Sequence, residues 1–356
     1  MIEEFGAADG VPCLYFHGTN SGPAEAALLG DAAQHRGVRL ISVPRPEPVA
    51  QPTTEEHPLV AWGRRLGLTA DELGLGRFVV AGWSAGASLA LACAHALPGR
   101  VSGAALINPA PPAGSSGLNR QQRAITFCCR HAPWLIRRVL APLLARASGV
   151  AAEHLDDPRA QSRALALFPR ADRGLLRAVL EDPVQRRMLG AMSAQSAAAG
   201  PGAIASDLLA VWGPRGWGFD PCGAVGPLHA FAGDQDASAP FVRMLARHSP
   251  QVCAHRFPGD HYGFLDEAVR DQICLAIRQQ HDDSRPVAVP ASGCRTPNAR
   301  ATASKRLRSA ATTMSSASTV GSKASIRQVS QARRSAGTRS GESPRGMIRR
   351  RSGGTR

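Results

Sequence analysis

The stretch of sequence that decides the fold is Phe78-Val79-Val80-Ala81-Gly82-Trp83-Ser84-Ala85-Gly86. Its first four residues form a short apolar run that stops at Gly82, which predicts a buried strand. The segment Gly-Trp-Ser-Ala-Gly has the form G-x-S-x-G and opens a helical pattern over 84–97. Between a strand and a helix, such a turn projects a serine hydroxyl above a sheet. The stretch therefore predicts Ser84 as a nucleophile, with the N–H of Ala85 directed at the same point.

Similar strand signals lie on both sides of this turn. The other apolar runs that predict strands are Val11–Phe16, Val38–Val43, Val101–Ile107, Leu228–Ala232 and Val252–Phe257. Helical patterns lie between them, among them 24–36 and 266–280. Nearly continuous apolar strands that alternate with helices are typical of a parallel sheet covered on both faces. The sequence therefore predicts an α/β fold with a mostly parallel sheet flanked by helices.

A serine hydroxyl is a poor nucleophile unless a base activates it. In chains that carry this turn, the base follows the last strand and an acid precedes the base. His261 lies in the loop 258–264, directly after the last predicted strand. The loop after the preceding strand offers two carboxylates, Asp234 and Asp236, and both are candidates for the acid.

Across residues 1–281 the sequence resembles the α/β-hydrolase superfamily, as a capped member with a serine nucleophile. Three features match it in order and spacing: the turn around Ser84, the Gly-x-x-Asp-x-x-x-Pro loop 233–240, and the Gly-x-His loop that ends at His261. The resemblance implies that Asp236 is the acid and that Asp234 caps its loop. Asp236 would hold the imidazole of His261 in the required tautomer and stabilise its protonated form.

The same resemblance implies an oxyanion-binding loop at His17-Gly18-Thr19, directly after the first clear strand. The N–H of Thr19 would then act together with the N–H of Ala85. His17 is expected to hydrogen-bond within this loop. Trp83 beside the nucleophile is expected, with His17, to border the substrate.

The resemblance also implies a division of the chain. Residues 1–110 and 205–281 are expected to form the α/β-hydrolase core. Residues 111–204 have helical spacing and no strand signal, and they are expected to form an inserted helical cap. The candidate pocket walls in this cap are Trp134, Leu135, Phe168 and Leu176. Because the sequence begins almost at the His-Gly strand, the N-terminal edge of the sheet is expected to be truncated.

Residues 282–356 differ in composition from the rest of the chain. They hold 16 Lys and Arg against 3 Asp and Glu, so they carry +13 of the formal net charge of +15. Few large apolar residues occur there, and burial cannot offset the ordering entropy, so this basic tail is predicted to be disordered. Three interpretations stay open: an adventitious extension, a tail that binds nucleic acid or other polyanions without sequence readout, or a docking peptide.

The composition limits the expected compartment and cofactors. No apolar stretch reaches the ~18 to 20 residues of a membrane span, and the acidic start of the chain does not look like a secretory signal. We therefore expect a cytoplasmic protein with no membrane partner. The 8 Cys residues include no Cys-x-x-Cys pair, so no zinc site is expected and free thiols are the default. The oligomeric state is not predicted.

These residues together predict a serine hydrolase that cleaves a small carboxylic ester or related acyl substrate through an acyl-enzyme on Ser84. No metal ion or organic cofactor is expected to take part. Two alternatives stay open: an acyltransferase that uses the same triad, and a non-catalytic ligand-binding protein on this fold. Product analysis with added acceptors would distinguish an acyltransferase from a hydrolase. A hydrogen bond of roughly 2.6 to 3.2 Å between Ser84 Oγ and His261 Nε2 would argue against the second.

Overall fold

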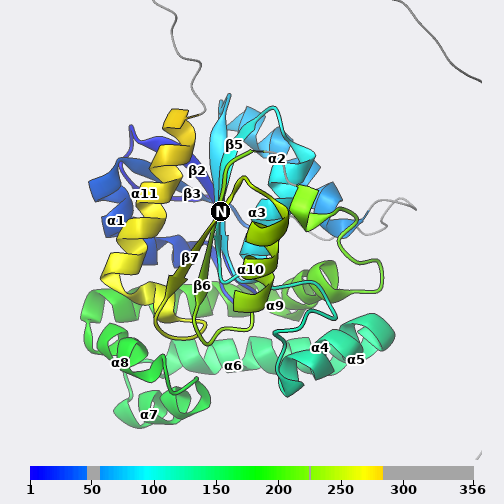
Figure 1. The fold of residues 1–356 in the computed structure, drawn as a ribbon. Coiled ribbons are helices and arrows are strands. Elements are labelled where there is room, and N and C mark those ends of the chain that lie inside the picture. The colour runs from blue at the N-terminus through cyan, green and yellow to red at the C-terminus, as the bar shows by residue number, and fades with distance from the viewer. Residues whose placement is uncertain (46–56, 224–225, 284–356) are drawn as a thin grey trace, which may run out of the picture. The chain divides into compact units, whose positions relative to one another are not determined.

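A sheet of seven strands forms the centre of the part of the chain that the structure, a computed structural model, describes: residues 1–45, 57–223 and 226–283 (Figure 1). The strands are β1 (Glu3–Gly6), β2 (Val11–Phe16), β3 (Val38–Ser42), β4 (Phe78–Trp83), β5 (Val101–Ile107), β6 (Leu228–Gly233) and β7 (Val252–Phe257). Their order is β1-β3-β2-β4-β5-β6-β7. All neighbouring pairs are parallel except β1 and β3.

The six strands predicted from apolar runs are all present, so the predicted mostly parallel sheet is confirmed. β4 extends two residues beyond the predicted run and ends directly before Ser84. At the N-terminal edge, Glu3–Gly6 forms the antiparallel strand β1 against β3. Arg39 of β3 and Glu4 of β1 form an ion pair at 2.7 Å on this edge. Charged side chains on an edge strand discourage further strand pairing.

Helices cover both faces of the sheet. They are α1 (Gly30–Arg36) and α11 (Glu267–Asp283) on one face, and α2 (Pro58–Glu72), α3 (Ala85–Ala96) and α10 (Ala239–His248) on the other (Figure 1). The helix predicted over 24–36 is divided, because the 3-10 helix η1 (Pro23–Leu29) precedes α1. The basic tail was predicted to begin at residue 282, but α11 includes Asp282 and Asp283. Its remaining residues, 284–356, lie outside the described residues.

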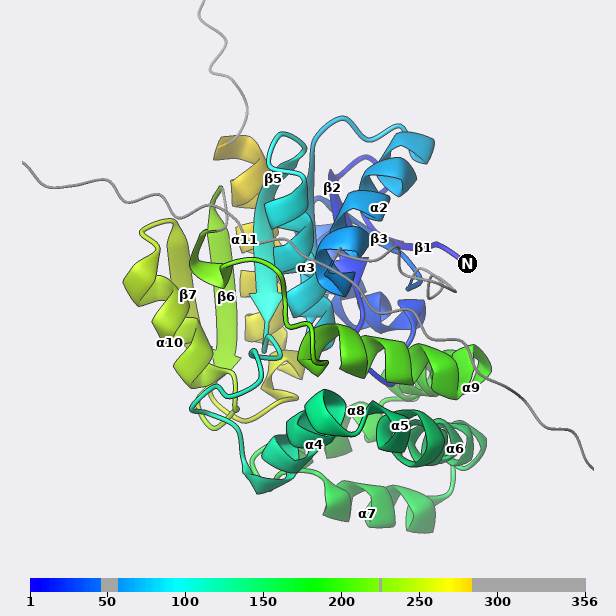
Figure 2. The ribbon, with the colours of Figure 1, turned by 90° about the vertical axis from the view of Figure 1, so that its right-hand side faces the viewer.

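A second group of helices lies at the carboxyl ends of the strands (Figure 2). It comprises α4 (Arg120–His131), α5 (Pro133–Leu135), η2 (Ile136–Leu140), α6 (Ala141–Glu153), α7 (Pro158–Leu167), α8 (Arg173–Glu181) and α9 (Pro183–Trp212). α9 bends at Gly200, whose φ is 76°, and Pro201 follows. The domain boundary predicted at residue 204 therefore falls within a helix.

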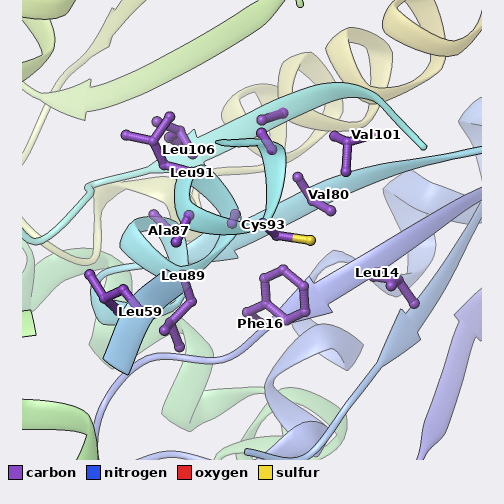
Figure 3. Close-up of a cluster of buried hydrophobic side chains, with 14 of the residues drawn as sticks. Leu14, Phe16, Leu59, Val80, Ala87, Leu89, Leu91, Cys93, Val101 and Leu106 are labelled. Atoms are coloured by element: carbon purple, nitrogen blue, oxygen red, sulfur yellow. The ribbon is translucent and has the colours of Figure 1, made fainter. Parts of the chain in front are cut away.

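The two faces of the sheet bury separate sets of side chains. Along β2, Leu14 and Phe16 point toward α2 and α3, whereas Cys13 and Tyr15 point toward the face covered by α1 and α11. Figure 3 shows Leu14 and Phe16 with the apolar residues that surround them. Burial on both faces explains why the central strands β2, β4 and β5 are nearly continuous apolar runs, whereas the edge strands β1 and β7 carry charged residues.

The turn from β4 into α3 requires glycine at two positions. A Cβ at Gly86 would overlap the carbonyl oxygen of Phe16, and a Cβ at Gly82 would overlap the carbonyl group of Gly86. Both neighbours are main-chain atoms that cannot move without displacing β2 or α3. The two glycines therefore set how closely the helix approaches the sheet behind Ser84.

We expect Gly86→Ala to destabilise the fold by about 3 kcal/mol or more, because the added methyl has no space beside β2. Gly99→Ala is the matched control, since no atom lies within 4 Å of the Cβ position at Gly99. This control should change stability by roughly 0.5 kcal/mol or less. Urea unfolding of both variants measures the difference, and equal midpoints would contradict the steric account.

Candidate active site

Ser84 lies between β4 and α3 with a strained main chain. Its φ is 57° and its ψ is −122°, a combination that costs a residue with a Cβ free energy. Four hydrogen bonds hold this conformation: Ser84 N–H donates to Ile107 O at 2.9 Å, and Ser84 O accepts from the N–H groups of Ala87, Ser88 and Ala110. The half-buried Ser84 is thus fixed at the end of β4, as the G-x-S-x-G pattern predicts.

His261 and Asp236 form a hydrogen-bonded pair. His261 Nδ1 lies 2.7 Å from Asp236 Oδ2, and the N–H of Ser238 donates to Asp236 Oδ1, also at 2.7 Å. The Asp236 side chain is 4% exposed and the His261 side chain 29%. Asp234, the other carboxylate of this loop, instead forms a surface ion pair with Arg256. Of the two candidate acids, only Asp236 meets the His261 ring.

The charges of this pair are coupled. Burial raises the pKa of Asp236, but the charge and hydrogen bond of His261 outweigh burial and leave the pKa below its usual value. Burial lowers the pKa of His261, but Asp236, followed by Asp260 and Asp172, outweighs burial and leaves the pKa above its usual value. The site therefore favours a protonated imidazole beside a carboxylate, the state that follows when a base accepts a proton.

The His261 loop is also held by its main chain. Asn108 Nδ2 donates to His261 O at 2.8 Å, and Asn108 Oδ1 accepts from Gly233 N–H at 2.9 Å. No role was predicted for Asn108, although its position directly after β5 indicates that it lies at the edge of the sheet where the strands end. Among the hydrogen bonds of the described residues, none joins the Ser84 hydroxyl to His261.

Trp83 packs beneath the His261 loop. Its indole N–H donates to His261 O at 3.1 Å, and its ring centroid lies 4.9 Å from that of His261. Its rings also contact Tyr262 and Phe264, and the side chain is 4% exposed. The Trp83 ring thus lies against the loop that carries His261 and also close to Gly18, and its predicted contact with substrate stays a prediction.

The loop His17-Gly18-Thr19 lies against Ser84. A Cβ at Gly18 would lie 3.5 Å from the Cβ of Ser84 and 2.8 Å from a ring carbon of Trp83, so this loop approaches as closely as glycine allows. His17 is buried, and its Nδ1 lies 2.8 Å from Gly18 O, which agrees with the expected hydrogen bond within the loop. Thr19 follows Gly18 in the chain, and Ala85 is the first residue of α3.

Two ionisable side chains for which no role was predicted, Glu25 and Arg45, hold this loop in place. Glu25 of η1 accepts from Gly18 N–H at 3.0 and 3.1 Å and from the Tyr15 hydroxyl at 2.8 Å. Arg45 donates to His17 O and forms an ion pair with Asp207 of α9 at 2.8 Å. Glu25 lies only 7 and 10 residues from its partners, whereas Arg45 and Asp207 are 162 residues apart, so no local pattern could have found that pair.

Burial gives these groups unusual proton affinities. It raises the pKa of Glu25 to about 7, although hydrogen bonds from Ser21, Gly18 and Tyr15 favour the ionised form. Burial, together with the nearby charge of Arg45, lowers the pKa of His17 well below its usual value. His17 is therefore neutral near pH 7, which leaves its ring free to hydrogen-bond within the loop.

The described residues contain no group of three or more His, Cys, Asp or Glu side chains arranged to hold a metal ion. Their seven cysteines are free thiols. No helix in the described ranges is long and apolar enough to span a membrane. Two cavities of about 220 and 490 Å³ lie beside the segment 112–131, and Ser84, Asp236 and His261 line neither.

No protein-family model and no curated protein matches the sequence. The structure is similar to an alpha/beta hydrolase fold protein from Nakamurella multipartita, with a TM-score of 0.56 and 19% identity over 78% of this chain and 94% of that one. For an esterase from Thermogutta terrifontis the TM-score is 0.52 and the identity 20%, over 80% of this chain and 93% of the esterase. For a structure reported with carboxylesterases of Nitrososphaera gargenis the TM-score is 0.53 and the identity 16%, over 80% of this chain and 95% of that one. The chain therefore has the α/β-hydrolase fold, as the resemblance implied.

The raised pKa of Glu25 predicts a pH dependence of stability. Its stabilising protonated form is fully present below the unfolded pKa, near 4.5, and is lost as pH rises through about 7. In Glu25→Gln this contribution is absent, so between pH 5 and 8 the wild type should lose roughly 2 to 3 kcal/mol more stability than the variant.

Urea unfolding at pH 5 and pH 8 measures this difference. Glu72→Gln, which removes an exposed carboxylate at the end of α2, is the matched control and should follow the wild type at both pH values. The same pH dependence in wild type and Glu25→Gln would contradict the raised pKa.

Proposed function

We propose that this protein is a serine hydrolase that cleaves a small carboxylic ester or related acyl substrate. The observation that carries the proposal is the strained turn at Ser84, next to the Gly18 loop and on the same sheet edge as the hydrogen-bonded His261–Asp236 pair. A nucleophile, a base and an acid that orients the base are the groups that acyl transfer needs. The esterase names of two structural neighbours support the same class of reaction.

In this mechanism Ser84 Oγ attacks the substrate carbonyl carbon while His261 Nε2 accepts the hydroxyl proton. The negative charge that develops on the carbonyl oxygen is stabilised by the N–H groups of Thr19 and Ala85, a type of contact worth ~3 kcal/mol per donor. Asp236 stabilises the protonated His261 ring through Nδ1 without accepting its proton. Collapse of the intermediate expels the alcohol, which takes its proton from His261.

The second half of the reaction repeats these steps with water. His261 removes a proton from a water molecule, which attacks the acyl carbon bonded to Ser84 Oγ. The second intermediate collapses, Ser84 regains its proton from His261, and the carboxylic acid leaves. Proton transfer needs Ser84 and His261 within hydrogen-bond distance, and such contacts commonly tighten only when substrate is bound.

We further propose that helices α4 to α9 act as a cap over this site, since they lie at the carboxyl ends of the strands. Of the expected pocket walls, Phe168 packs edge-on against Tyr262, at 5.1 Å between ring centroids, next to His261. Leu176 is buried in the cluster that contains Trp83. Trp134 is 65% exposed, so it does not line an enclosed pocket in this arrangement.

A fluorophosphonate probe tests whether Ser84 is activated. We expect one adduct per chain on the wild type, and none on Ser84→Ala or His261→Ala, when the intact proteins are weighed by mass spectrometry. Ser116→Ala removes an exposed serine outside the site and should keep the adduct. No adduct on folded wild type would reject the proposal in favour of a ligand-binding protein. Acyl transfer to an added alcohol or thiol, in place of hydrolysis, would assign an acyltransferase.

The two carboxylates of the 233–240 loop provide a second test. Asp236→Asn should lower kcat by about 10³- to 10⁴-fold, because the His261 ring loses the charge that orients it and stabilises its protonated form. Asp234→Asn removes only a surface ion pair and should stay close to wild type. Steady-state hydrolysis of an activated ester measures both, and equal losses would contradict the assignment of Asp236.

A further inference from the structure

A carboxylate from the helical group binds the main chain on both sides of His261. Asp172 lies in the turn between α7 and α8, and its side chain is fully buried. Its Oδ1 accepts from Asp260 N–H at 2.7 Å, and its Oδ2 accepts from Tyr262 N–H at 2.9 Å. The two oxygens of one side chain therefore hold the residues directly before and after His261.

This contact is not ordinary helix capping. Asp172 occupies the N-cap position of α8, where an aspartate usually accepts from the N–H groups of its own first turn. Asp182 does so at the start of α9, with Val184 and Gln185 as donors. Asp172 makes no such bond to α8. Its carboxylate is directed away from its own helix and toward the His261 loop.

The surrounding packing keeps Asp172 at this place. On the helical side, Leu176 and Leu180 of α8 are buried in one cluster with Phe264 and Leu265, at the end of the His261 loop. A Cβ at Gly259, where φ is 110°, would lie 3.1 Å from Asp172 Oδ1. The loop can therefore approach the carboxylate this closely because residue 259 is glycine.

The charge of Asp172 also favours the protonated form of the His261 ring. No ion pair involving Asp172 occurs among the described residues, and the neighbouring Arg173 donates to the carbonyl oxygens of Phe168 and Ala166 instead. The other acidic groups that face His261 are Asp236 and Asp260. Burial, followed by the charges of Asp236 and Asp172, raises the pKa of Asp260 to about 6. Glu25 and Asp172 also raise the pKa of the buried Tyr262 hydroxyl beyond the effect of burial.

We infer that Asp172 is a positioning residue of this site, through which the helical group fixes the His261 loop so that the imidazole meets Asp236. The catalytic role of Asp172 rests on the proposed function, whereas its contact with the His261 loop does not. Asp172 acts through the main chain and through its charge, and it touches neither Ser84 nor the atoms that react.

Two effects of Asp172→Asn follow from this geometry. An amide has one acceptor oxygen, so one of the two N–H groups loses its partner and the loop is held less firmly. Loss of the negative charge also makes the protonated His261 ring less favourable, which lowers its pKa. A neutral ring is the active base, so the acid limb of the pH–rate profile should move to lower pH while the plateau rate falls.

The test measures the rate constant of fluorophosphonate labelling from pH 5 to 9 in the full chain. Asp172→Asn should lower the plateau by about 10- to 100-fold, the effect of a small displacement of a catalytic group. Its acid limb should move down by roughly 0.5 to 1 pH unit. Asp182→Asn is the matched control, an N-cap aspartate of the same helical group, and should keep the wild-type limb and plateau. A profile of Asp172→Asn equal to that of Asp182→Asn would overturn the inference.

Two measurements by NMR keep the inference testable independently of labelling. In the wild type, the amides of Asp260 and Tyr262 should be protected from hydrogen exchange, and free exchange of both would overturn the inference even if Asp172→Asn does not fold. The pKa of the His261 ring, identified through its absence in His261→Ala, should be lower in Asp172→Asn. If the wild type is not labelled, the proposed function fails, while an unchanged ring pKa in Asp172→Asn would overturn the role of Asp172 separately.

Discussion

The close contact between α3 and β2 at Gly86 is the constraint on which the rest of the site depends. The helix can begin directly above the sheet only because Gly86 has no side chain facing Phe16 O. This approach forces Ser84 into its positive φ and places it beside the loop that follows β2. The residues that meet Ser84 are therefore those that end the neighbouring strands, which explains how segments far apart in the chain converge at one edge.

Buried carboxylates organise the groups around Ser84 by accepting main-chain N–H bonds. Glu25 accepts from Gly18 in the loop that contains Thr19, Asp236 accepts from Ser238, and Asp172 accepts from both neighbours of His261. A buried charge is tolerated when such bonds replace its hydration. Each of these carboxylates fixes a loop that has little regular structure of its own. The rigidity of the site thus comes from polar contacts, and the apolar clusters support it from below.

Much of the fold could be predicted from sequence because its signals are local. The strands are apolar runs ended by glycine, proline or asparagine, and the turn at Ser84 is a motif of five consecutive residues. The pairing of Asp236 with His261 followed from resemblance, and the geometry agrees with it. Asp172 and the Arg45–Asp207 pair gave no local signal, because their partners are far away in the chain. Only the folded chain shows that the partners of Asp172 lie 88 and 90 residues further on.

The ion pair between Arg45 and Asp207 has a consequence for exchanging parts among proteins of this fold. Asp207 lies after the bend at Gly200, so it would stay with the host if residues 111–204 were replaced by those of another protein. The anchor of the Gly18 loop would then survive in such a chimaera. Asp172 would be lost with the exchanged segment, and the host loop around His261 would meet foreign side chains. Under the proposed function, modular exchange would thus alter the reactivity of the host together with its choice of substrate.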